Sequence, residues 1–337
     1  MYTTNTEINN QLSIWLIVMF WIISFMIIVG GLTRLTDSGL SITEWELFSG
    51  FFPPLNQNDW IVYFNLYKQI PEFKLQNYNM TLSEFKVIFW WEWAHRFLGR
   101  LIGIVFLIPL IYLFFKHDFN FVKKYVLIFL LICLQGFLGW YMVSSGLVDR
   151  VDVSHYRLSI HLFVAFVILS LVIWEFLLNI NLKKIKINFK TYLPEIFLFL
   201  LFIQLILGAF VSGMDAGKIY NNWPLMGQNY YPDDSYFSDL FKLNAFDNPS
   251  IVQFIHRNMA YVILIFYLFM VFKFSKIKVK YINNIIYIIG IILFLQIFLG
   301  IFTLLSGANI FYSSLHQINT IFLFSSSIYF IFRTKQN

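Results

Sequence analysis

Charged side chains are scarce in this sequence. Asp, Glu, Lys and Arg together make up 12% of its 337 residues, whereas 59% are hydrophobic and 41 are phenylalanine. Soluble globular domains carry about twice that share of charge, and a soluble fold of this composition would expose more apolar surface than water tolerates. Despite a net charge of +6, the composition excludes soluble enzymes, nucleic-acid-binding proteins and disordered chains. It is typical of a polytopic membrane protein.

Cysteine is almost absent, with Cys133 as the only one. A single cysteine excludes a disulfide bond within the chain and a zinc or iron–sulfur site built from several thiolates. The apolar segments also lack the alternation of polar and apolar residues that a membrane β-barrel requires. We therefore predict an all-α integral membrane protein.

Eight apolar segments are long enough to cross a bilayer, which takes about 20 residues. They are 13–33, 87–115, 125–147, 157–179, 193–213, 250–272, 283–305 and 313–332. The first is too long for the apolar part of a signal peptide, and no cleavage site of small residues follows it. We expect it to be retained as a transmembrane helix.

Basic residues gather on one side of the predicted membrane. Thirteen of the 24 Lys and Arg residues lie in the even-numbered loops or at the C-terminus: Lys116, Lys123, Lys124, Lys183, Lys184, Lys186, Lys190, Lys273, Lys276, Lys278, Lys280, Arg333 and Lys335. By the positive-inside rule both termini are cytoplasmic. The first odd-numbered loop, about residues 34–86, is then outside.

The chain contains an internal duplication. Residues of one half recur in the other at an offset that changes only where loops differ in length. The pairs are Asp37 and Asp215, Gly39 and Gly217, Trp45 and Trp223, Pro54 and Pro232, Leu134-Gln135 and Leu295-Gln296, Leu138-Gly139 and Leu299-Gly300, His95-Arg96 and His256-Arg257, and His161 and His316. The repeat predicts two tandem pseudo-symmetric four-helix bundles in the same orientation. They would occupy residues 13–180 and 193–332 and be joined by the basic link near 180–192.

Four of the six histidines occupy equivalent places in the two halves: His95, His161, His256 and His316. Each is expected in the first turns of an even-numbered span, near the outer surface. An imidazole inside a bilayer is costly without a partner, and two histidines on facing helices can ligate one haem iron from both sides. Each half is therefore predicted to hold one haem.

Other interpretations of the histidines stay open. A single intramembrane histidine can be a hydrogen-bonded packing residue. Zinc or copper would need a third and a fourth donor, and neither half offers Cys, Met or carboxylates in matched positions.

Arg96 and Arg257 each follow one of these histidines directly. A guanidinium group binds a carboxylate through two hydrogen bonds, so both arginines are candidates for binding haem propionates. The alternative is an interfacial arginine on a lipid phosphate. Four helical glycines are expected to let helices approach closely: Gly136, Gly139, Gly208 and Gly300.

The two halves differ beside the first histidine. Glu92 lies one helical turn before His95, and the equivalent residue before His256 is Gln253. A buried carboxylate can accept a proton or stabilise a cation, which an amide does poorly. The asymmetry indicates catalysis in the N-terminal half and a fixed cofactor in the C-terminal half. The alternative is that Glu92 is a solvated interface residue.

The sequence resembles haem A synthases of the mitochondrial and alphaproteobacterial branch over about residues 13–332. The matching segments are GGLTRLTDSGLSITEW at 30–45, GFFPPL at 50–55, YKQIPEFK at 67–74, FWWEWAHRFLGRLIG at 89–103, LQGFLGWYMVSSGL at 134–147 and VQFIHRNMAY at 252–261. The outer-loop and EWAHR segments are the most specific of these.

The resemblance implies an enzyme that converts haem O to haem A, the cofactor of cytochrome c oxidase, by two successive hydroxylations of the C8 methyl group to a formyl group. It implies that His95 and His161 bind the substrate haem, that Glu92 is the catalytic acidic residue, and that His256 and His316 hold a permanent haem b. It also implies a bacterial inner-membrane protein, with its haem sites toward the periplasm, and haem O synthase as a partner.

Two rival functions and one departure from the family accompany this resemblance. A di-haem b-type cytochrome exchanging electrons with quinone would leave both haems chemically unchanged. A transporter would often have inverted repeats and broken helices, whereas four spans in each half predict parallel repeats. Some family members carry a cysteine pair in the first outer loop, and this chain has none there, which excludes a thiol mechanism at that loop.

Overall fold

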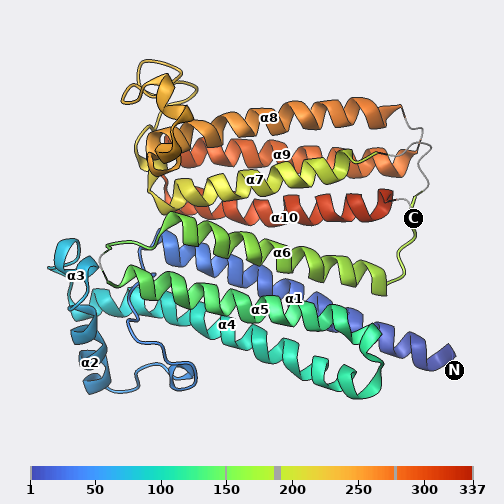
Figure 1. Cartoon of the computed structure of the whole chain (residues 1–337), viewed down its shortest axis with the longest axis horizontal. Coiled ribbons are helices and arrows are strands. Elements are labelled where there is room, and N and C mark those ends of the chain that lie inside the picture. The colour runs from blue at the N-terminus through green and yellow to red at the C-terminus, as the bar shows by residue number, and fades with distance from the viewer. Residues whose placement is uncertain (1, 149, 186–190, 277–278, 336–337) are drawn as a thin grey trace. The chain divides into compact units, whose positions relative to one another are not determined.

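The computed structural model describes residues 2–148, 150–185, 191–276 and 279–335, with side chains from residue 10 onward. Lys186, Lys190 and Lys278, which the topology prediction uses, lie outside the described residues. Eight long helices carry the fold: α1 (Tyr2–Leu35), α4 (Leu82–Lys116), α5 (Phe119–Gly146), α6 (His155–Asn179), α7 (Leu193–Gly213), α8 (Pro249–Ser275), α9 (Lys280–Leu305) and α10 (Ile310–Thr334). They are labelled in Figure 1.

All eight helices are long and apolar enough to cross a membrane. The bounds of seven of them agree with the predicted spans to within two helical turns, whereas α1 begins at Tyr2 and not at residue 13, and no β-strand occurs in the described ranges. The prediction of an all-α multi-pass membrane protein with eight spans is therefore confirmed. The chain divides into two compact units, Trp21–Ile168 and Met1–Phe20 with Leu169–Asn337. The boundaries predicted from the repeat, 13–180 and 193–332, stay a prediction.

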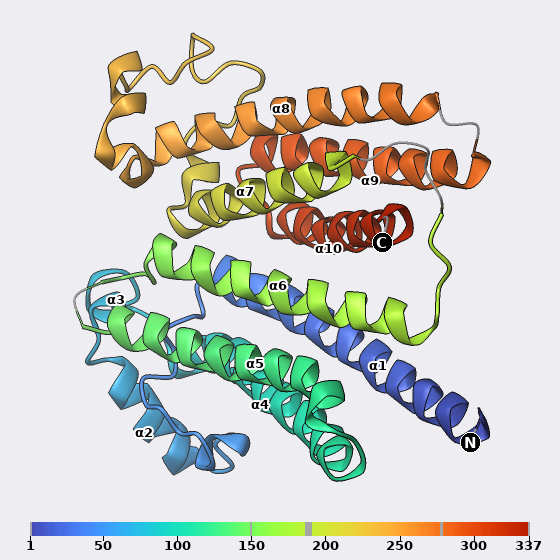
Figure 2. The same ribbon diagram turned by 45° about the vertical axis from the view of Figure 1, so that its right-hand side comes forward.

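In the unit Trp21–Ile168, α4 and α5 run side by side, joined by a short loop (Figure 2). α4 begins at Leu82, earlier than predicted, because Thr81 and Glu84 form a capping box in which the Glu84 carboxylate accepts from Thr81 N at 2.7 Å. His95 therefore lies in the fourth turn of its helix and not in the first turns.

The long first loop has a structure of its own that hydropathy did not predict. It contains α2 (Gln57–Tyr67) and α3 (Pro71–Leu75), which begin at the side-chain cap of Asn56 and at Pro71. Their apolar side chains pack on the first turns of α4 and on residues 40–42. The buried members of this core are Leu40, Ile42, Trp60, Phe64, Tyr67, Ile70, Phe85, Ile88, Phe89 and Val153.

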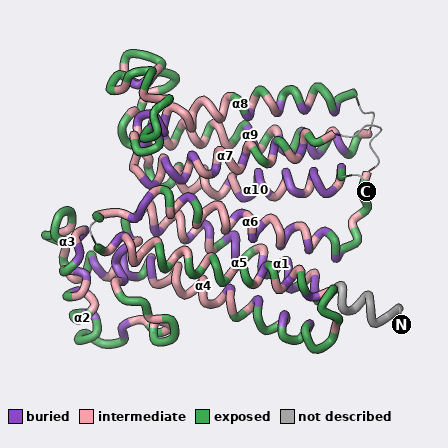
Figure 3. The backbone as a smooth tube through the Cα atoms, in the orientation of Figure 1, coloured by how far each residue is buried: buried purple, intermediate pink, exposed green. Residues whose placement is uncertain are grey.

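In the other unit, α7, α8, α9 and α10 form a four-helix bundle (Figure 1). The loop between α7 and α8 contains three short 3₁₀ helices: η2 (Ala216–Lys218), η3 (Phe237–Phe241) and η4 (Leu243–Asp247). Among the candidate spans α10 has the largest buried share, visible as purple segments in Figure 3. α10 is therefore a central helix of its unit.

The duplication reappears in the local backbone. Asp37 and Asp215, which are equivalent in the repeat, follow α1 and α7 with φ angles of 48° and 52°. Few non-glycine residues adopt this left-handed conformation, and aspartate is among those that tolerate it best. The loops after α1 and α7 thus leave their helices through the same turn.

Candidate functional site

His95 on α4 and His161 on α6 face each other inside the first unit. Their ring centroids are 6.5 Å apart, with an interplanar angle of 65°. Two imidazoles bound to one metal ion through bonds of about 2.0–2.1 Å would have centroids about 6 Å apart. The spacing therefore fits one metal ion held between the two rings, as bis-histidine haem ligation requires.

Three of the four imidazoles also have a ring nitrogen without a hydrogen-bond partner in the described part of the chain. The Nδ1 atoms of His95, His161 and His256 are buried and have no hydrogen-bond partner in the described part of the chain. A buried polar atom without a partner is costly. Its occurrence at three repeat-related positions fits a site built for a ligand.

Each of the four histidines packs against a glycine of the neighbouring helix. A Cβ built on that glycine would lie 2.8–3.1 Å from the imidazole Cε1, closer than real Cβ contacts allow without a shift. The pairs are Gly30 with His95, Gly139 with His161, Gly208 with His256 and Gly300 with His316. The absence of a Cβ at these glycines makes room for the four imidazole rings.

The expected close approach at glycines holds at three of the four positions. A Cβ on Gly136 would meet nothing within 4 Å, so the expectation is wrong there. Sequence reasoning also missed Gly30. The signal was available, because Gly30 and Gly208 are separated by the same offset as Gly39 and Gly217.

Three glutamines tie the histidine-bearing helices to their neighbours. Gln135 Nε2 donates to the backbone oxygen of His161 at 2.9 Å, and Gln296 Nε2 donates to that of His316 at 3.0 Å. Gln204 Nε2 donates to the backbone oxygen of His256 at 3.1 Å. The repeated Leu-Gln motif thus fixes the backbone at the second histidine of each half.

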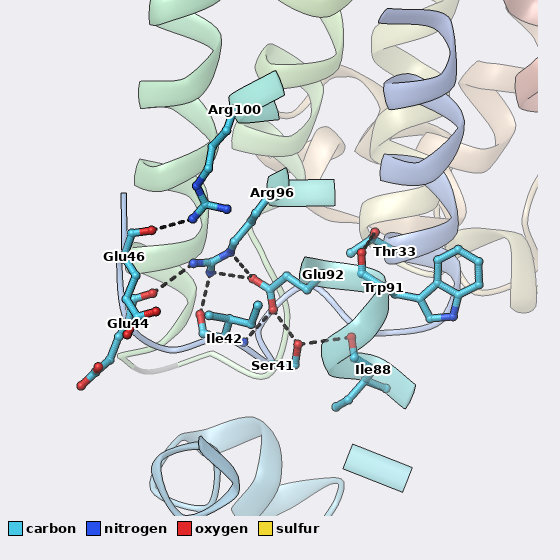
Figure 4. A network of polar contacts seen from close by, with 10 residues as sticks. All are labelled: Thr33, Ser41, Ile42, Glu44, Glu46, Ile88, Trp91, Glu92, Arg96 and Arg100. Carbon is cyan, nitrogen blue, oxygen red and sulfur yellow. Dashed lines mark hydrogen bonds and ion pairs between the residues drawn. The ribbon is translucent and has the colours of Figure 1, made fainter. Parts of the chain in front are cut away.

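Glu92 lies one turn from His95 and is buried, with 2% of its surface exposed. Its Oε2 accepts from Ser41 Oγ and from Ile42 N, both at 2.7 Å. Its Oε1 accepts from Arg96 Nε at 3.0 Å and from Arg96 Nη2 at 2.6 Å. The interpretation of Glu92 as a solvated interface residue is therefore wrong. Figure 4 shows its carboxylate directed at the outer loop and bonded through both oxygens.

Arg96 extends the same network (Figure 4). Beyond its ion pair with Glu92, it donates to Ile42 O at 2.6 Å and to Glu44 O at 3.0 Å. One helical turn further, Arg100 donates to Glu46 O at 2.6 Å. Three charged side chains of α4 thus satisfy polar backbone groups of residues 42–46.

The other unit repeats this arrangement without the carboxylate. Arg257 donates to Tyr220 O at 2.9 Å and to Asn222 O at 3.1 Å, which are the repeat equivalents of Ile42 and Glu44. Gln253 accepts from Arg257 at 3.0 Å and donates to Ala216 O at 2.8 Å. Both arginines anchor the loops that follow α1 and α7, and their binding of haem propionates stays a prediction.

The site offers paired donors only. Within the described ranges, no three His, Cys, Asp or Glu side chains gather into a possible metal site. Two opposed imidazoles suit an iron whose four remaining ligands come from a porphyrin.

These features define a multi-pass membrane protein with two repeat-related histidine sites. Residues 13–328 match the COX15-CtaA family of cytochrome oxidase assembly proteins. The chain is 48% identical to the haem A synthase of Pelagibacter ubique (strain HTCC1062), with 100% of both chains covered. It is 42% identical to that of Rickettsia bellii (strain RML369-C), covering 95% of this chain and 97% of the relative. The haem A synthase of Flavobacterium johnsoniae is 40% identical, with 97% and 99% covered. The chain belongs to this family, which confirms the resemblance seen in its motifs.

Proposed function

We propose that the protein is a haem A synthase, a membrane enzyme that oxidises the C8 methyl group of haem O to the formyl group of haem A in two successive hydroxylations. The observation that carries the proposal is the His95–His161 pair, whose rings lie 6.5 Å apart and rest on glycines. Family membership over residues 13–328 and relatives named haem A synthase support it.

The two sites have different tasks in this proposal. His95 and His161 bind the iron of the substrate haem O, and His256 and His316 hold a permanent haem b. When bound, haem b supplies a one-electron redox centre. The repeat-related glycines and the unpaired imidazole nitrogens support two haem-sized sites.

Glu92 and Arg96 act beside the substrate. Together they hold residues 41–44 against α4. The carboxylate also places a negative charge one turn from His95, where it stabilises positive charge that develops at the methyl carbon or accepts its proton. Arg96 and Arg257 are also candidates for binding the propionates.

The proposal includes a location. The protein lies in the bacterial inner membrane, surrounded by lipid, with both termini in the cytoplasm and the haem sites toward the periplasm. Haem O is poorly soluble in water, and this favours direct transfer from haem O synthase as a partner.

The test is to extract the haems from cells that make haem O and express this protein, and to identify them by chromatography and mass. We expect haem A with the wild-type protein, and none with His95→Ala. The His256→Ala variant should lose the low-spin haem b spectrum, because one imidazole cannot supply both axial ligands. A wild-type protein that leaves all haem unchanged would contradict the proposal and favour a di-haem cytochrome.

A further inference from the structure

The second histidine of each pair is held differently in the two halves. His316 Nδ1 lies 3.0 Å from the backbone oxygen of Gln296. A carbonyl oxygen can only accept, so this contact places the His316 proton on Nδ1 and the lone pair on Nε2, which lies 3.3 Å from the Gln296 side-chain nitrogen. The Nδ1 of His161 has no partner in the described part of the chain.

The side chain of Gln296 is itself fixed. Its Oε1 accepts from Asn319 Nδ2 at 2.7 Å, and its Nε2 donates to Thr320 Oγ1 at 2.9 Å. Asn319 also donates to Ile292 O at 2.9 Å, and Thr320 Oγ1 donates to His316 O at 3.0 Å. This network connects α9 and α10 around the imidazole.

The N-terminal half lacks this network. Its residues equivalent to Asn319 and Thr320 are Val164 and Ala165, which have no polar side-chain atoms. Gln135 still donates to His161 O at 2.9 Å. However, its Oε1 is buried without a partner in the described residues.

The first histidines differ in another way, because the Nδ1 atoms of His95 and His256 both lack a partner among the described residues. Gln204 Nε2 lies 3.5 Å from His256 Nε2 and donates to His256 O at 3.1 Å. The equivalent of Gln204 in the repeat is Met26, one turn before Gly30 as Gln204 is one turn before Gly208. Polar side chains cost free energy inside a bilayer unless they are bonded. Three such side chains lie around the C-terminal histidine pair, and apolar residues replace all three around the N-terminal pair. This difference indicates that the two pairs have different tasks.

We infer that Gln204, Asn319 and Thr320 are positioning residues that make the C-terminal pair a permanent haem site, whereas their apolar counterparts leave the N-terminal pair free to release its haem. The inference rests on the proposed function. A cofactor site must retain its haem through many turnovers, but a substrate site must let its product go. Partners of a metal-bound histidine fix the orientation of the ring and raise its basicity.

The test uses the full-length protein in detergent and the double substitution Asn319→Val with Thr320→Ala, which copies Val164 and Ala165. We expect haem b to transfer to excess apomyoglobin faster than from the wild type, by at most about the 10- to 100-fold that loss of a direct partner typically costs, because Asn319 and Thr320 act on the imidazole through Gln296. The low-spin ferric EPR signal should shift, because it reports imidazole orientation. The single substitution Thr320→Ser retains the hydroxyl group and Asn319. It should therefore keep the wild-type transfer rate and EPR signal.

A matched control removes a hydroxyl from the same helix. Ser325 donates to Ile321 O on α10 at 2.7 Å, so Ser325→Ala should change neither the transfer rate nor the EPR signal. An unchanged rate and signal in the Asn319→Val, Thr320→Ala variant would overturn the inference. A wild-type protein without haem b would instead overturn the proposed function.

The reciprocal variant does not depend on whether the first one folds. Val164→Asn with Ala165→Thr gives Gln135 the partners that Gln296 has. We expect more haem A to copurify with this variant and its release to apomyoglobin to slow, while the haem b signal is unchanged. Release at the wild-type rate would overturn the inference.

Discussion

At the residue scale, Glu92 combines the proposed chemical task with an observed structural one. Glu92→Gln removes the charge, and we expect haem A production to fall by about 10²- to 10⁴-fold, the usual worth of a positioned acid or base. Glutamine has the shape of glutamate but cannot make all of its hydrogen bonds, because both Glu92 oxygens accept, one from Ile42 N and the other from Arg96. An amide would turn a donor toward one of them. Extracted haems measure the effect.

Ser41→Ala separates the two tasks of Glu92. It removes one hydrogen bond to the carboxylate and leaves the charge in place. If catalysis depends on the negative charge of Glu92, Ser41→Ala should cause only a small part of the loss of haem A production that Glu92→Gln causes. Near-normal haem A from Glu92→Gln, or equal losses from both variants, would contradict a catalytic Glu92.

Glu72 in α3 is predicted to make stability depend on pH. Burial in the outer-loop core raises the pKa of this carboxyl group from 4.5 to about 8. The folded state therefore holds the Glu72 proton more tightly than the unfolded state. The contribution of Glu72 to the free energy of unfolding is full below pH 4.5, falls as the pH rises and is lost above about pH 8.

Thermal unfolding measured by intrinsic fluorescence across this pH range checks the Glu72 prediction. Glu72→Gln should flatten the decrease, since an amide does not titrate. An identical pH profile in wild type and variant would show that another group is responsible.

At the element scale, the approach of α1 to α4 depends on Gly30. A Cβ at this position would lie 2.8 Å from His95 Cε1, so Gly30→Ala must displace the imidazole or separate the helices. We expect haem A production to fall while the haem b spectrum of the other unit is retained. Gly136→Ala is the matched control, since its Cβ would meet nothing within 4 Å and alanine favours the helix by about 1 kcal/mol. Equal activity of the two variants would contradict the role of Gly30.

At the scale of the whole molecule, the orientation in the membrane follows from the basic residues. A reporter fused after Lys335 should be cytoplasmic, and a tag inserted beside the exposed Asp233 should be periplasmic. Protease protection in spheroplasts measures both. The opposite result would place the histidine sites at the cytoplasmic face and contradict the proposed location.

Much of this protein followed from the sequence by itself. Eight spans, the duplication and the four equivalent histidines were predictable, because hydropathy and residue identity are properties of the chain read in order. The pairing of His95 with His161 also followed, since the repeat allows each half only two such residues.

Only the tertiary structure decided what these residues touch. Glu92 meets Ser41 and Ile42 across a long loop, and the buried core around Glu72 forms where that loop folds back on α4. The polar network around His316 likewise joins two helices. Such contacts bring together residues distant in the chain, and local pattern does not contain them. The physical reason is that hydrogen-bond partners and burial depend on how helices pack, whereas the tendency to span a membrane depends on each helix alone.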